Sequence, residues 1–557
     1  MCGIWCYCGT QEYSLDTVKQ CVEQIKARGP EQTSYDLSGL TWGFGFTRLA
    51  INGLSHAADQ PFSHQSLEWI CNGEIYNHKE LAERFNWTLA SGSDCEIIGH
   101  MYNALDKNLV AWARCFDGVF AIAMYDKAAK KLILARDPYG VRPLYYGFIG
   151  QTLFAASEIK ALPVDATGVQ AFPPGHVAEY SPEIGLVFTK YHAIPWLKNP
   201  LYGPIIIEMG ATYALKAALE AAVHKRLMTE RPCAALLSGG LDSSLIAALV
   251  QTELQKQGKP PLETYSIGFA GSSDLKYARL VAEHIGSVHH EIVSTPDEFF
   301  AAIPEVIKAI ESPDITTVRA SVGNWLVAKY IKTHSPSQAK VVFNGDGSDE
   351  VFGSYLYFNN APSDEAFEAE VERLLTDIHH FDVLRSDRSI SSHGLEPRTP
   401  FLDKQFVALA RSIGTKYLRP TPTQPEKWIL RKAFEKTFFT KGLATLPLLP
   451  KEVLWRRKEA FSDGVSGTEK SWYEEIQERV AADGIELLSP YEMKRLYPIL
   501  TPPTLEAYYY RQIYDDLYNH LVIPYYWMPR WSGETTDPSA RTLKVYNAIN
   551  CDKKLNL

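Results

Sequence analysis

The stretch from Pro232 to Gln251 reads PCAALLSGGLDSSLIAALVQ and determines how the second half of the chain folds. Its first apolar residues, Cys233–Leu237, predict a buried strand, and the apolar spacing after Asp242 predicts a helix. The intervening loop contains two glycines, several serine hydroxyls and one carboxylate. Glycine lets the backbone approach a ligand closely, and a helix N-terminus attracts anions. A carboxylate there suits a divalent ion that bridges phosphates, so this stretch predicts a phosphate-binding unit.

This loop lacks the Gly-Lys-Ser/Thr ending of a Walker phosphate loop. Its sequence SGGLDSS, residues 238–244, instead resembles the PP-loop of the ATP pyrophosphatase family, which cleaves ATP between its α- and β-phosphates. A plain Gly-Ser turn between strand and helix is the alternative for the motif taken alone. The family pattern implies an ATP-binding set of Leu237, Ser238, Gly239, Gly240, Asp242, Ser243, Ile267, Asn344 and Gly345.

Strands and helices alternate after this loop. Glu263–Phe269 predicts a strand, Lys276–Ile285 a helix and Val288–Val293 another strand. Such alternation is typical of a parallel sheet covered by helices on both faces.

Composition limits the classes of protein that fit this chain. Its 557 residues exceed a single core and predict two to four domains. A net charge of −9 without a basic block argues against nucleic acid as the main partner. No uncharged run approaches the ~18–20 residues needed to span a bilayer, and the N-terminus shows no signal-peptide pattern. We therefore expect a cytoplasmic protein that binds neither nucleic acid nor membranes.

The cysteines do not form the framework of a secreted disulfide protein, since there are nine at uneven spacing. Cys6 and Cys8 would share one face of a strand, which raises the alternative of a metal site. Their spacing is not that of a zinc site, and cysteine packs well as a small core residue, so packing is the favoured interpretation.

The chain begins Met1-Cys2. Removal of Met1 would leave Cys2 with an α-amine of pKa ~7.7–8.0, which takes up the thiol proton near neutral pH. One residue would then supply both nucleophile and base. A cysteine in second position is more often incidental when it stands alone, so this interpretation needs further motifs.

Four further segments supply them: Arg28–Pro30, Gly45–Ile51, Cys71–Asn77 and Ser93–Glu96. Together with Cys2 they resemble, in order and spacing, the class II glutamine amidotransferases, which have an N-terminal nucleophile fold. Short alternating strands between residues 42 and 157 agree with stacked antiparallel sheets.

The resemblance implies a role for each residue type. Cys2 attacks the carboxamide of glutamine, and the Asn72 amide with the Gly73 N–H stabilises the oxyanion. Asn72-Gly73 is also a common hairpin turn, and we expect it to serve as both. A guanidinium suits the substrate carboxylate, and acidic side chains suit its ammonium group. The implied glutamine-binding set is Arg48, Leu49, Ala50, Ile51, Asn52, Asn72, Gly73, Glu74 and Asp94.

Three segments of the second half carry further polar side chains. Ser312–Ser321 includes Thr317 and Arg319, which we expect to bind aspartate. Val341–Glu350 predicts a strand followed by an acidic glycine loop without the register of an EF-hand. By family pattern, Asp349 of that loop and Asp242 bind Mg²⁺. Lys458, within Trp455–Gly464, neutralises charge on the transferring phosphate. A lysine in an Arg-Arg-Lys run is otherwise usually solvated.

The two halves together resemble the glutamine-hydrolysing asparagine synthetase family over nearly the whole chain. This implies an α+β N-terminal nucleophile sandwich domain in residues 1–195. An α/β parallel-sheet ATP pyrophosphatase domain with a helical C-terminal part follows in residues 205–557. The implied substrates are glutamine, aspartate and ATP with Mg²⁺, and the implied intermediate is β-aspartyl-AMP. Ammonia would pass through a tunnel at an apolar domain interface, and a homodimer is expected by family analogy.

Two positions depart from the family pattern, which reads Ser-Gly-Glu-Gly-Ser-Asp-Glu where this chain has Asn344 to Glu350. Asp346 replaces a catalytic glutamate and is one methylene shorter, and a displacement of about 1 Å can cost on the order of 100-fold in rate. Asn344 replaces a serine. We expect a shifted loop and a working synthetase site that is slower or altered. The alternatives are an amide synthetase for another carboxylate and a non-catalytic descendant that retains ligand binding.

Overall fold

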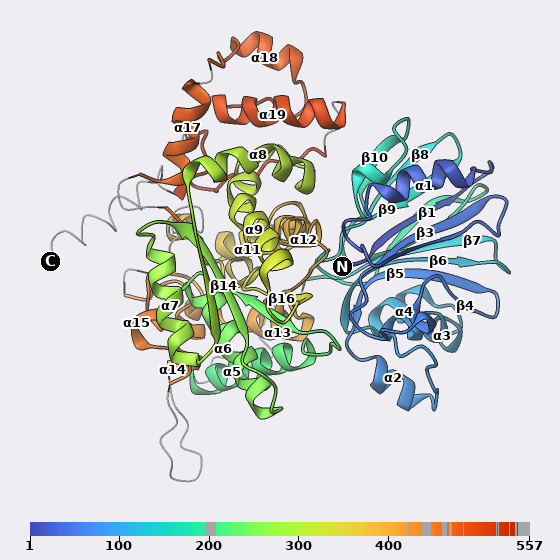
Figure 1. Ribbon diagram of the computed structural model, residues 1–557, viewed down its shortest axis with the longest axis horizontal. Coiled ribbons are helices and arrows are strands. Elements are labelled where there is room, and N and C mark those ends of the chain that lie inside the picture. Colours follow the sequence, from blue (N-terminus) through green and yellow to red (C-terminus); the bar gives the residue numbers. More distant parts are fainter. Residues whose placement is uncertain are drawn as a thin grey trace.

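The computed structural model describes residues 1–194, 208–421, 423–435, 447–458, 465–466, 470–482, 484–519, 521, 523–533, 535–540 and 543. These residues form two bodies that lie side by side (Figure 1). The predicted boundary between residues 195 and 205 lies outside the described residues, so the limits of the two domains stay predictions. Within the described part, no helix is both long and apolar enough to cross a bilayer.

Two antiparallel sheets of six strands form the N-terminal body. The first has the order β10 (Thr167–Ala171), β8 (Tyr145–Ile149), β9 (Thr152–Ala156), β1 (Gly3–Cys8), β3 (Trp42–Arg48) and β2 (Gln32–Asp36). The second has the order β12 (Gly185–Lys190), β11 (His176–Ser181), β7 (Lys131–Arg136), β6 (Gly118–Asp126), β5 (Leu67–Ile75) and β4 (Phe62–His64). The expected antiparallel sandwich is confirmed.

Helices cover the outer faces of both sheets and make a four-layered body (Figure 1). Alternation in β1 shows the layering, because Ile4, Cys6 and Cys8 face the core between the sheets while Trp5 and Tyr7 pack under a helix. Cys6 and Cys8 are therefore core residues, as expected. The first sheet is covered by α1 (Leu15–Glu23), and the second by α2 (His78–Arg84), α3 (Ile97–Ala104) and α4 (Leu109–Cys115).

A parallel sheet of five strands organises the second body, which confirms the predicted α/β fold. Its order is β15 (Val288–Ser294), β14 (Glu263–Phe269), β13 (Cys233–Leu236), β16 (Val341–Phe343) and β17 (Glu396–Arg398). One core, beneath the sheet, contains apolar side chains of α5 (Glu208–Lys225), α6 (Leu241–Lys256) and α7 (Ser273–Ile285). A second core contains side chains of α8 (Pro296–Ile310) and α9 (Ile315–His334). Helices therefore cover both faces.

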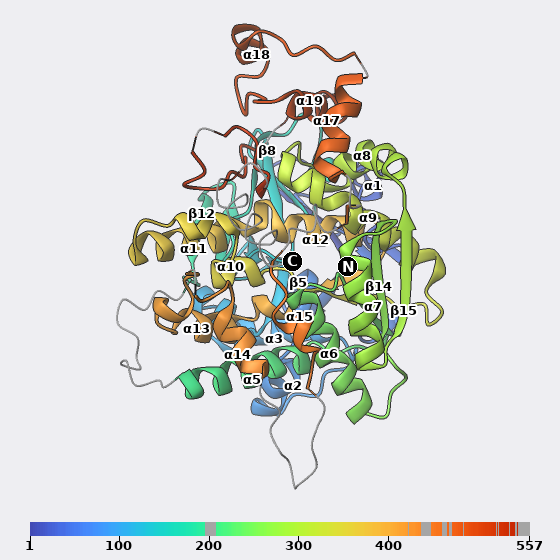
Figure 2. The same cartoon turned by 90° about the vertical axis from the view of Figure 1, so that its left-hand side faces the viewer.

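The remaining helices pack around this sheet and complete the two cores of the second body. The first core also includes residues of α10 (Ser348–Phe352), α11 (Asp364–Asp377), α12 (Asp382–Ser391), α13 (Lys404–Arg411), α14 (Trp428–Glu435) and α15 (Lys451–Leu454). The second core includes α17 (Trp472–Ala482) and α19 (Leu505–Tyr518). Figure 2 shows these two above α8, with α18 (Pro490–Leu496) beyond them. The predicted helical C-terminal part is confirmed.

The interface between the bodies has an apolar part and a charged part. Leu49, Ile51 and Val141 of the N-terminal body join the first core of the second body. Beside them, Arg28 forms a buried ion pair across the interface with Asp387 at 2.8 Å. The expectation of an apolar interface is therefore confirmed for one part and wrong for the other.

Candidate active sites

The predicted phosphate loop connects β13 to α6. The Ser238 N–H donates to the Ser243 hydroxyl at 3.1 Å, which closes the loop on itself. Gly239 has a φ of +72°, and a Cβ there would lie 2.5 Å from the backbone of Ala278. Only glycine fits both conditions, so the loop is held against the middle of α7.

A second loop, residues 344–347, follows β16 and touches the first loop. A Cβ on Gly345 would lie 2.8 Å from the Asp242 Cβ and 2.8 Å from the Ser243 nitrogen. Glycine is thus required because the two loops meet backbone to backbone. The carboxyl ends of β13 and β16 are adjacent in the sheet, which is why loops about 100 residues apart meet.

These loops border a cavity of about 290 Å³. The predicted residues that line it are Leu237, Ser238, Gly240, Asp242, Ser243, Ile267, Thr317, Arg319, Asn344, Gly345, Asp346, Asp349 and Lys458. Gly239 lies behind this wall. The part of the Trp455–Gly464 motif after Lys458 lies outside the described residues. Sequence segments spread over more than 200 residues therefore meet at one cavity.

Two lysines pair with the predicted metal-binding acids. Lys427 Nζ lies 2.5 Å from Asp242 Oδ2 and 2.6 Å from Asp349 Oδ1, while Lys458 pairs with the other oxygen of Asp349. Burial alone would raise the pKa of Asp349, but Lys427 and Lys458 hold it far below its usual range. Burial likewise opposes charge on Lys458, whereas Asp349 and Asp242 raise its pKa above the ordinary value.

Sequence reasoning missed Lys427. It is 2% exposed and has a φ of 56°, a conformation that costs energy for a residue other than glycine. Its neighbours in the sequence match no phosphate or metal motif. Only the fold brings it between two acids that are 107 residues apart.

The donor set fits a divalent ion that also binds phosphate. Within the described ranges, no group of three or more His, Cys, Asp and Glu side chains could hold a metal by itself. Mg²⁺, however, usually takes one or two carboxylates and fills its other positions with water and phosphate oxygens. Asp242 and Asp349 meet that requirement, because oxygens of both reach one cation, the Lys427 ammonium.

Asp346 belongs to the same acidic loop as Asp349, but it contacts α12 and not the two lysines. Its Oδ1 is 3.2 Å from Arg385, and its Oδ2 has no hydrogen-bond partner among the described residues. Burial and the neighbouring Asp382 carboxylate raise the pKa of Asp346 to about 7, although Arg385 opposes this. A carboxylate with a pKa near neutral suits proton transfer. Asn344 donates to the Ser386 hydroxyl at 2.6 Å, so both departures from the family pattern face α12.

The two residues expected to bind aspartate are both engaged within the protein. Thr317 donates to Asp314 at 2.7 Å. Arg319 is 5% exposed and pairs with the carboxylates of Glu506 and Asp537. Both predicted residues line the cavity, but the Arg319 guanidinium already holds two carboxylates, and binding a third would require one of them to move.

A second, much smaller cavity of about 30 Å³ lies in the N-terminal body. It is lined by the predicted residues Cys2, Arg48, Leu49, Ala50, Ile51, Asn52, Gly73, Glu74 and Asp94. Such a volume holds about two water molecules. Nine of the ten residues predicted for the glutamine site therefore line this cavity, and the tenth, Asn72, is fully buried beside it.

The Asn72-Gly73 pair is part of β5 and not a hairpin turn, so that part of the prediction is wrong. It pairs with Ala121 and Phe120 of β6, and a Cβ on Gly73 would lie 2.1 Å from the Val119 carbonyl oxygen. Close strand contact therefore requires this glycine. Both polar atoms of the Asn72 side chain lack a hydrogen-bond partner among the described residues, as expected of a donor kept for an oxyanion.

Cys2 lies next to the amino terminus, whose charge opposes the effect of burial on the pKa of the thiol. Its Sγ donates to the Leu49 carbonyl at 3.7 Å, and burial raises the pKa of the thiol to about 11. The Met1 amine lies 3.4 Å from the Leu395 carbonyl, and burial lowers its pKa to about 6. Arg28 Nε donates to the Cys2 carbonyl at 3.0 Å.

Carboxylates surround the other end of this cavity. Asn52 donates to Glu74 at 2.6 Å, and Asp94 accepts from the Ile75 N–H at 2.6 Å. Glu396 of β17 also lines the cavity, although it belongs to the second body and carries no motif that marks it. Burial, followed by the nearby Glu396 and Asp94 carboxylates, raises the pKa of Glu74 well above its usual value. This environment suits an ammonium group.

Arg48 is placed at the cavity, but its guanidinium binds the protein. It donates to the carbonyls of Gly53 and Ser55 and pairs with Asp59. It thereby closes the loop of residues 49–59 over the cavity. A substrate carboxylate at this guanidinium would have to replace one of these partners.

Comparison with known proteins agrees with both cavities. The asparagine synthase family matches residues 214–534, and the glutamine amidotransferase domain matches residues 1–184. Asparagine synthetase [glutamine-hydrolyzing] of Gallus gallus is 40% identical over 588 residues, covering 98% of this chain and 99% of the relative. The proteins of that name from Bos taurus and Homo sapiens are 40% identical over 584 residues with the same coverage. The chain therefore belongs to the asparagine synthase family.

Proposed function

We propose that this chain makes asparagine from aspartate, with glutamine as nitrogen donor and ATP as the activating substrate, and releases glutamate, AMP and pyrophosphate. One observation carries the proposal. A half-buried Cys2 thiol that lines the small cavity, and an unpartnered Asn72 amide, occur in the same chain as a phosphate loop that shares the large cavity with Lys458. Relatives that are 40% identical over almost the whole chain carry the corresponding name.

In the glutamine half, Cys2 attacks the substrate carboxamide and forms a thioester with release of ammonia. The α-amine exposed by removal of Met1 would take the thiol proton. Asn72 and Gly73 donate to the oxyanion. Glu74 and Asp94 bind the substrate ammonium, and the remaining lining residues shape the site around the glutamine side chain.

In the synthetase half, the phosphate loop binds ATP and the aspartate β-carboxylate attacks its α-phosphorus. The bond to pyrophosphate breaks and β-aspartyl-AMP forms, because a free carboxylate is a poor acyl donor. Lys458 neutralises negative charge at the reacting phosphate. Ammonia then displaces AMP, and Asp346 accepts the proton that the amine loses. Thr317 and Arg319 are the proposed contacts of aspartate.

Mg²⁺ is part of this proposal. When bound, it supplies positive charge that neutralises the ATP phosphates, and Asp242 with Asp349 would hold it. The Lys427 ammonium contacts the same two carboxylates, so these acids already share a cation.

The decisive experiment incubates the purified chain with Mg-ATP, aspartate and amide-¹⁵N glutamine, and follows AMP, pyrophosphate and labelled asparagine together. We expect AMP, pyrophosphate and labelled asparagine in equal amounts. Glutamate release without AMP would reject the synthetase half. AMP release with another carboxylate in place of aspartate would favour a related amide synthetase.

The proposal extends to organisation in the cell. Domain limits at 1–195 and 205–557 and a cytoplasmic location are expected from the sequence, and a homodimer is expected by family analogy. Light scattering on the purified chain measures the mass of the particle, and a monomer at working concentration would reject the dimer.

A further inference from the structure

One short helix, α12, contacts the structural support of both cavities. Its residues Asp382, Arg385 and Ser386 contact the acidic loop of the large cavity. Gly347 N–H donates to Asp382 at 2.8 Å, and Arg385 lies 3.2 Å from Asp346. These contacts fix one side of the helix on the synthetase site.

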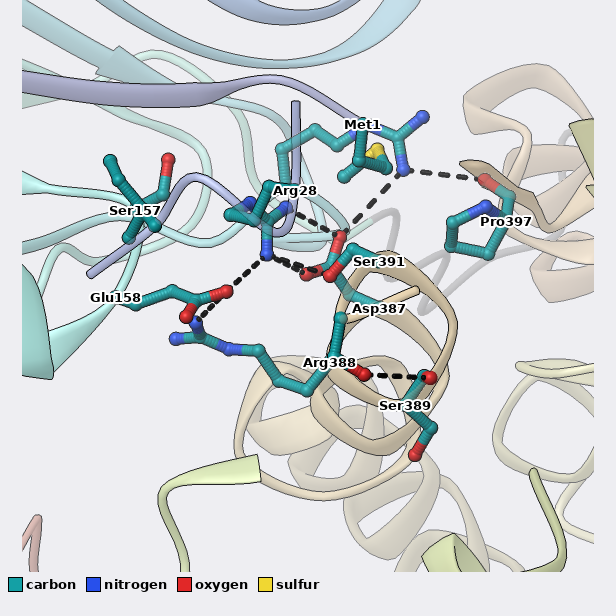
Figure 3. Close-up of polar contacts among 12 residues, drawn as sticks. Met1, Arg28, Ser157, Glu158, Asp387, Arg388, Ser389, Ser391 and Pro397 are labelled. Carbon is teal, nitrogen blue, oxygen red and sulfur yellow. Dashed lines mark hydrogen bonds and ion pairs between the residues drawn. The ribbon is translucent and has the colours of Figure 1, made fainter. Parts of the chain in front are cut away.

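The opposite side of the same helix contacts the support of Cys2. Arg28 lies 2.8 Å from Asp387 Oδ2 and 3.3 Å from its Oδ1, and it donates to the Ser391 hydroxyl at 2.9 Å. The Nε of the same guanidinium donates to the Cys2 carbonyl at 3.0 Å. Figure 3 shows the contacts of Arg28 with Asp387 and Ser391. A single side chain, that of Arg28, therefore separates Asp387 from the nucleophile backbone.

The surrounding charges hold this arrangement rigid. Glu158 lies 2.7 Å from Arg28 and 2.8 Å from Arg388, and Arg388 lies 3.0 Å from Glu311. Figure 3 shows Glu158 between the two guanidinium groups, next to Asp387. Arg28, Asp387 and Arg388 are each at most 2% exposed. Paired charges without access to water have little freedom to rearrange, so the network fixes the position of the Cys2 carbonyl.

We propose that Asp387 is a positioning residue for glutamine hydrolysis, supplied to the N-terminal site by the synthetase domain through Arg28. This rests on the proposed hydrolysis of glutamine at Cys2. Asp387 touches neither substrate nor Cys2; it orients the guanidinium that holds the nucleophile backbone. The adjacent Ser386 performs the corresponding task for Asn344 of the acidic loop, with a hydrogen bond of 2.6 Å. One helix therefore sets the geometry of both reaction centres.

The test substitutes the two sides of α12 separately in the full chain. Asp387→Asn keeps the shape and removes the charge that orients Arg28. We expect kcat for glutamine hydrolysis to fall about 10- to 100-fold, the cost of misplacing a reacting group by about 1 Å, with little change in KM for glutamine. Ammonia-dependent asparagine synthesis should stay within about twofold, since this substitution leaves the loop contacts of α12 intact. Ser386→Ala should lower ammonia-dependent asparagine synthesis and leave glutamine hydrolysis nearly unchanged.

Two further variants guard against a folding defect. Ser391→Ala removes only one hydrogen bond to Arg28 and should lower hydrolysis by about fivefold, the effect of losing about 1 kcal/mol. Asp515→Asn breaks a buried pair with Arg511 in α19 and serves as the matched control, because neither residue lines a cavity. A parallel fall of hydrolysis and ammonia-dependent synthesis in Asp387→Asn, or unchanged hydrolysis, would overturn the proposal.

Hydrogen exchange separates this proposal from the proposed function. In Asp387→Asn, amides of residues 2–8 should exchange faster while those of α19 stay unchanged, because the substitution loosens Arg28, which holds the Cys2 carbonyl. Unchanged exchange of residues 2–8 would reject the positioning role whether or not the enzyme is active. Absence of glutamine hydrolysis in the unaltered chain would instead reject the proposed function.

Discussion

The two cavities of this protein differ in where the cations that compensate their acids lie. The large cavity, about 290 Å³, has its acids neutralised from within, because Lys427 and Lys458 pair with Asp349. The small cavity, about 30 Å³, gathers the carboxylates of Glu74, Asp94 and Glu396. In the first, the compensating lysines line the cavity with the acids. In the second, Arg398 pairs with Glu74 at 3.5 Å and with Glu396 at 2.9 Å but does not line the cavity.

This difference follows from what each site would bind. ATP brings negative charge, so cations must already be in place. Glutamine brings an ammonium group, and carboxylates whose pKa is raised by burial and mutual repulsion, such as that of Glu74, become favourable once that group binds. The comparison predicts that each cavity can be disabled without the other.

The largest effect tests this independence. Cys2→Ala removes the sulfur that forms the proposed thioester, so glutamine-dependent synthesis should fall to background, at least about 10⁴-fold. Ammonia-dependent synthesis should persist, because Cys2 does not line the large cavity. Labelled asparagine is measured with each nitrogen donor. Cys115→Ala, a half-buried thiol in α4, is the control. Glutamine-dependent activity in Cys2→Ala would show that another group is the nucleophile.

The next effect tests the internal cation. Lys427→Met removes the ammonium between Asp242 and Asp349 and leaves these two half-buried acids without it. We expect AMP formation to fall about 100-fold, as for loss of one preorganised charge at a reaction centre, while glutamine hydrolysis is unchanged. Pyrophosphate release reports the rate.

Lys432→Met is the matched control for this prediction. It lies on α14 close to Lys427, pairs with Glu435 near the surface and does not line the cavity. Equal loss in both variants would indicate a destabilised helix and not a missing cation. Full activity of Lys427→Met would show that Mg²⁺ alone neutralises these acids.

The sequence predicted the parts of these sites that local chemistry encodes. The strand-loop-helix after Cys233 needs apolar residues and glycines in consecutive positions, so it was readable without the fold. Lys427 and Glu396 were not, because each acts on residues more than 70 positions away and its neighbours match no motif. The Asn72-Gly73 pair was misread as a turn because propensity ignores the β6 strand that pairs with it.

For two of the predicted residues, the structure shows ion-pair partners that the sequence did not predict. Arg48 and Arg319 were expected to bind substrate carboxylates, whereas in the structure each pairs with a carboxylate of the protein. Charge complementarity identifies the residue type from sequence, whereas the partner it chooses depends on loops that arrive from elsewhere. The sequence thus identifies which arginine lies at each site, but not which carboxylates pair with its guanidinium.

The smallest expected effect is a shift in pH dependence within the large cavity. Asp346 must be ionised to accept a proton, and its pKa of about 7 means that ammonia-dependent synthesis should fall as pH drops through neutrality. Arg385 lowers this pKa, so Arg385→Gln should raise it and move the acid limb upward by about one pH unit. Rates are compared at constant unprotonated ammonia, because ammonia itself titrates.

Two comparisons make this shift specific. Arg419→Gln, which breaks a surface pair with Asp364, should leave the limb in place. Asp346→Glu restores the family side chain, and it should accelerate amide formation if the shorter acid is misplaced by part of an ångström. An unmoved limb in Arg385→Gln would mean that another group accepts the proton. The acidic loop would then resemble the small cavity, with a carboxylate whose task is to bind charge rather than to transfer a proton.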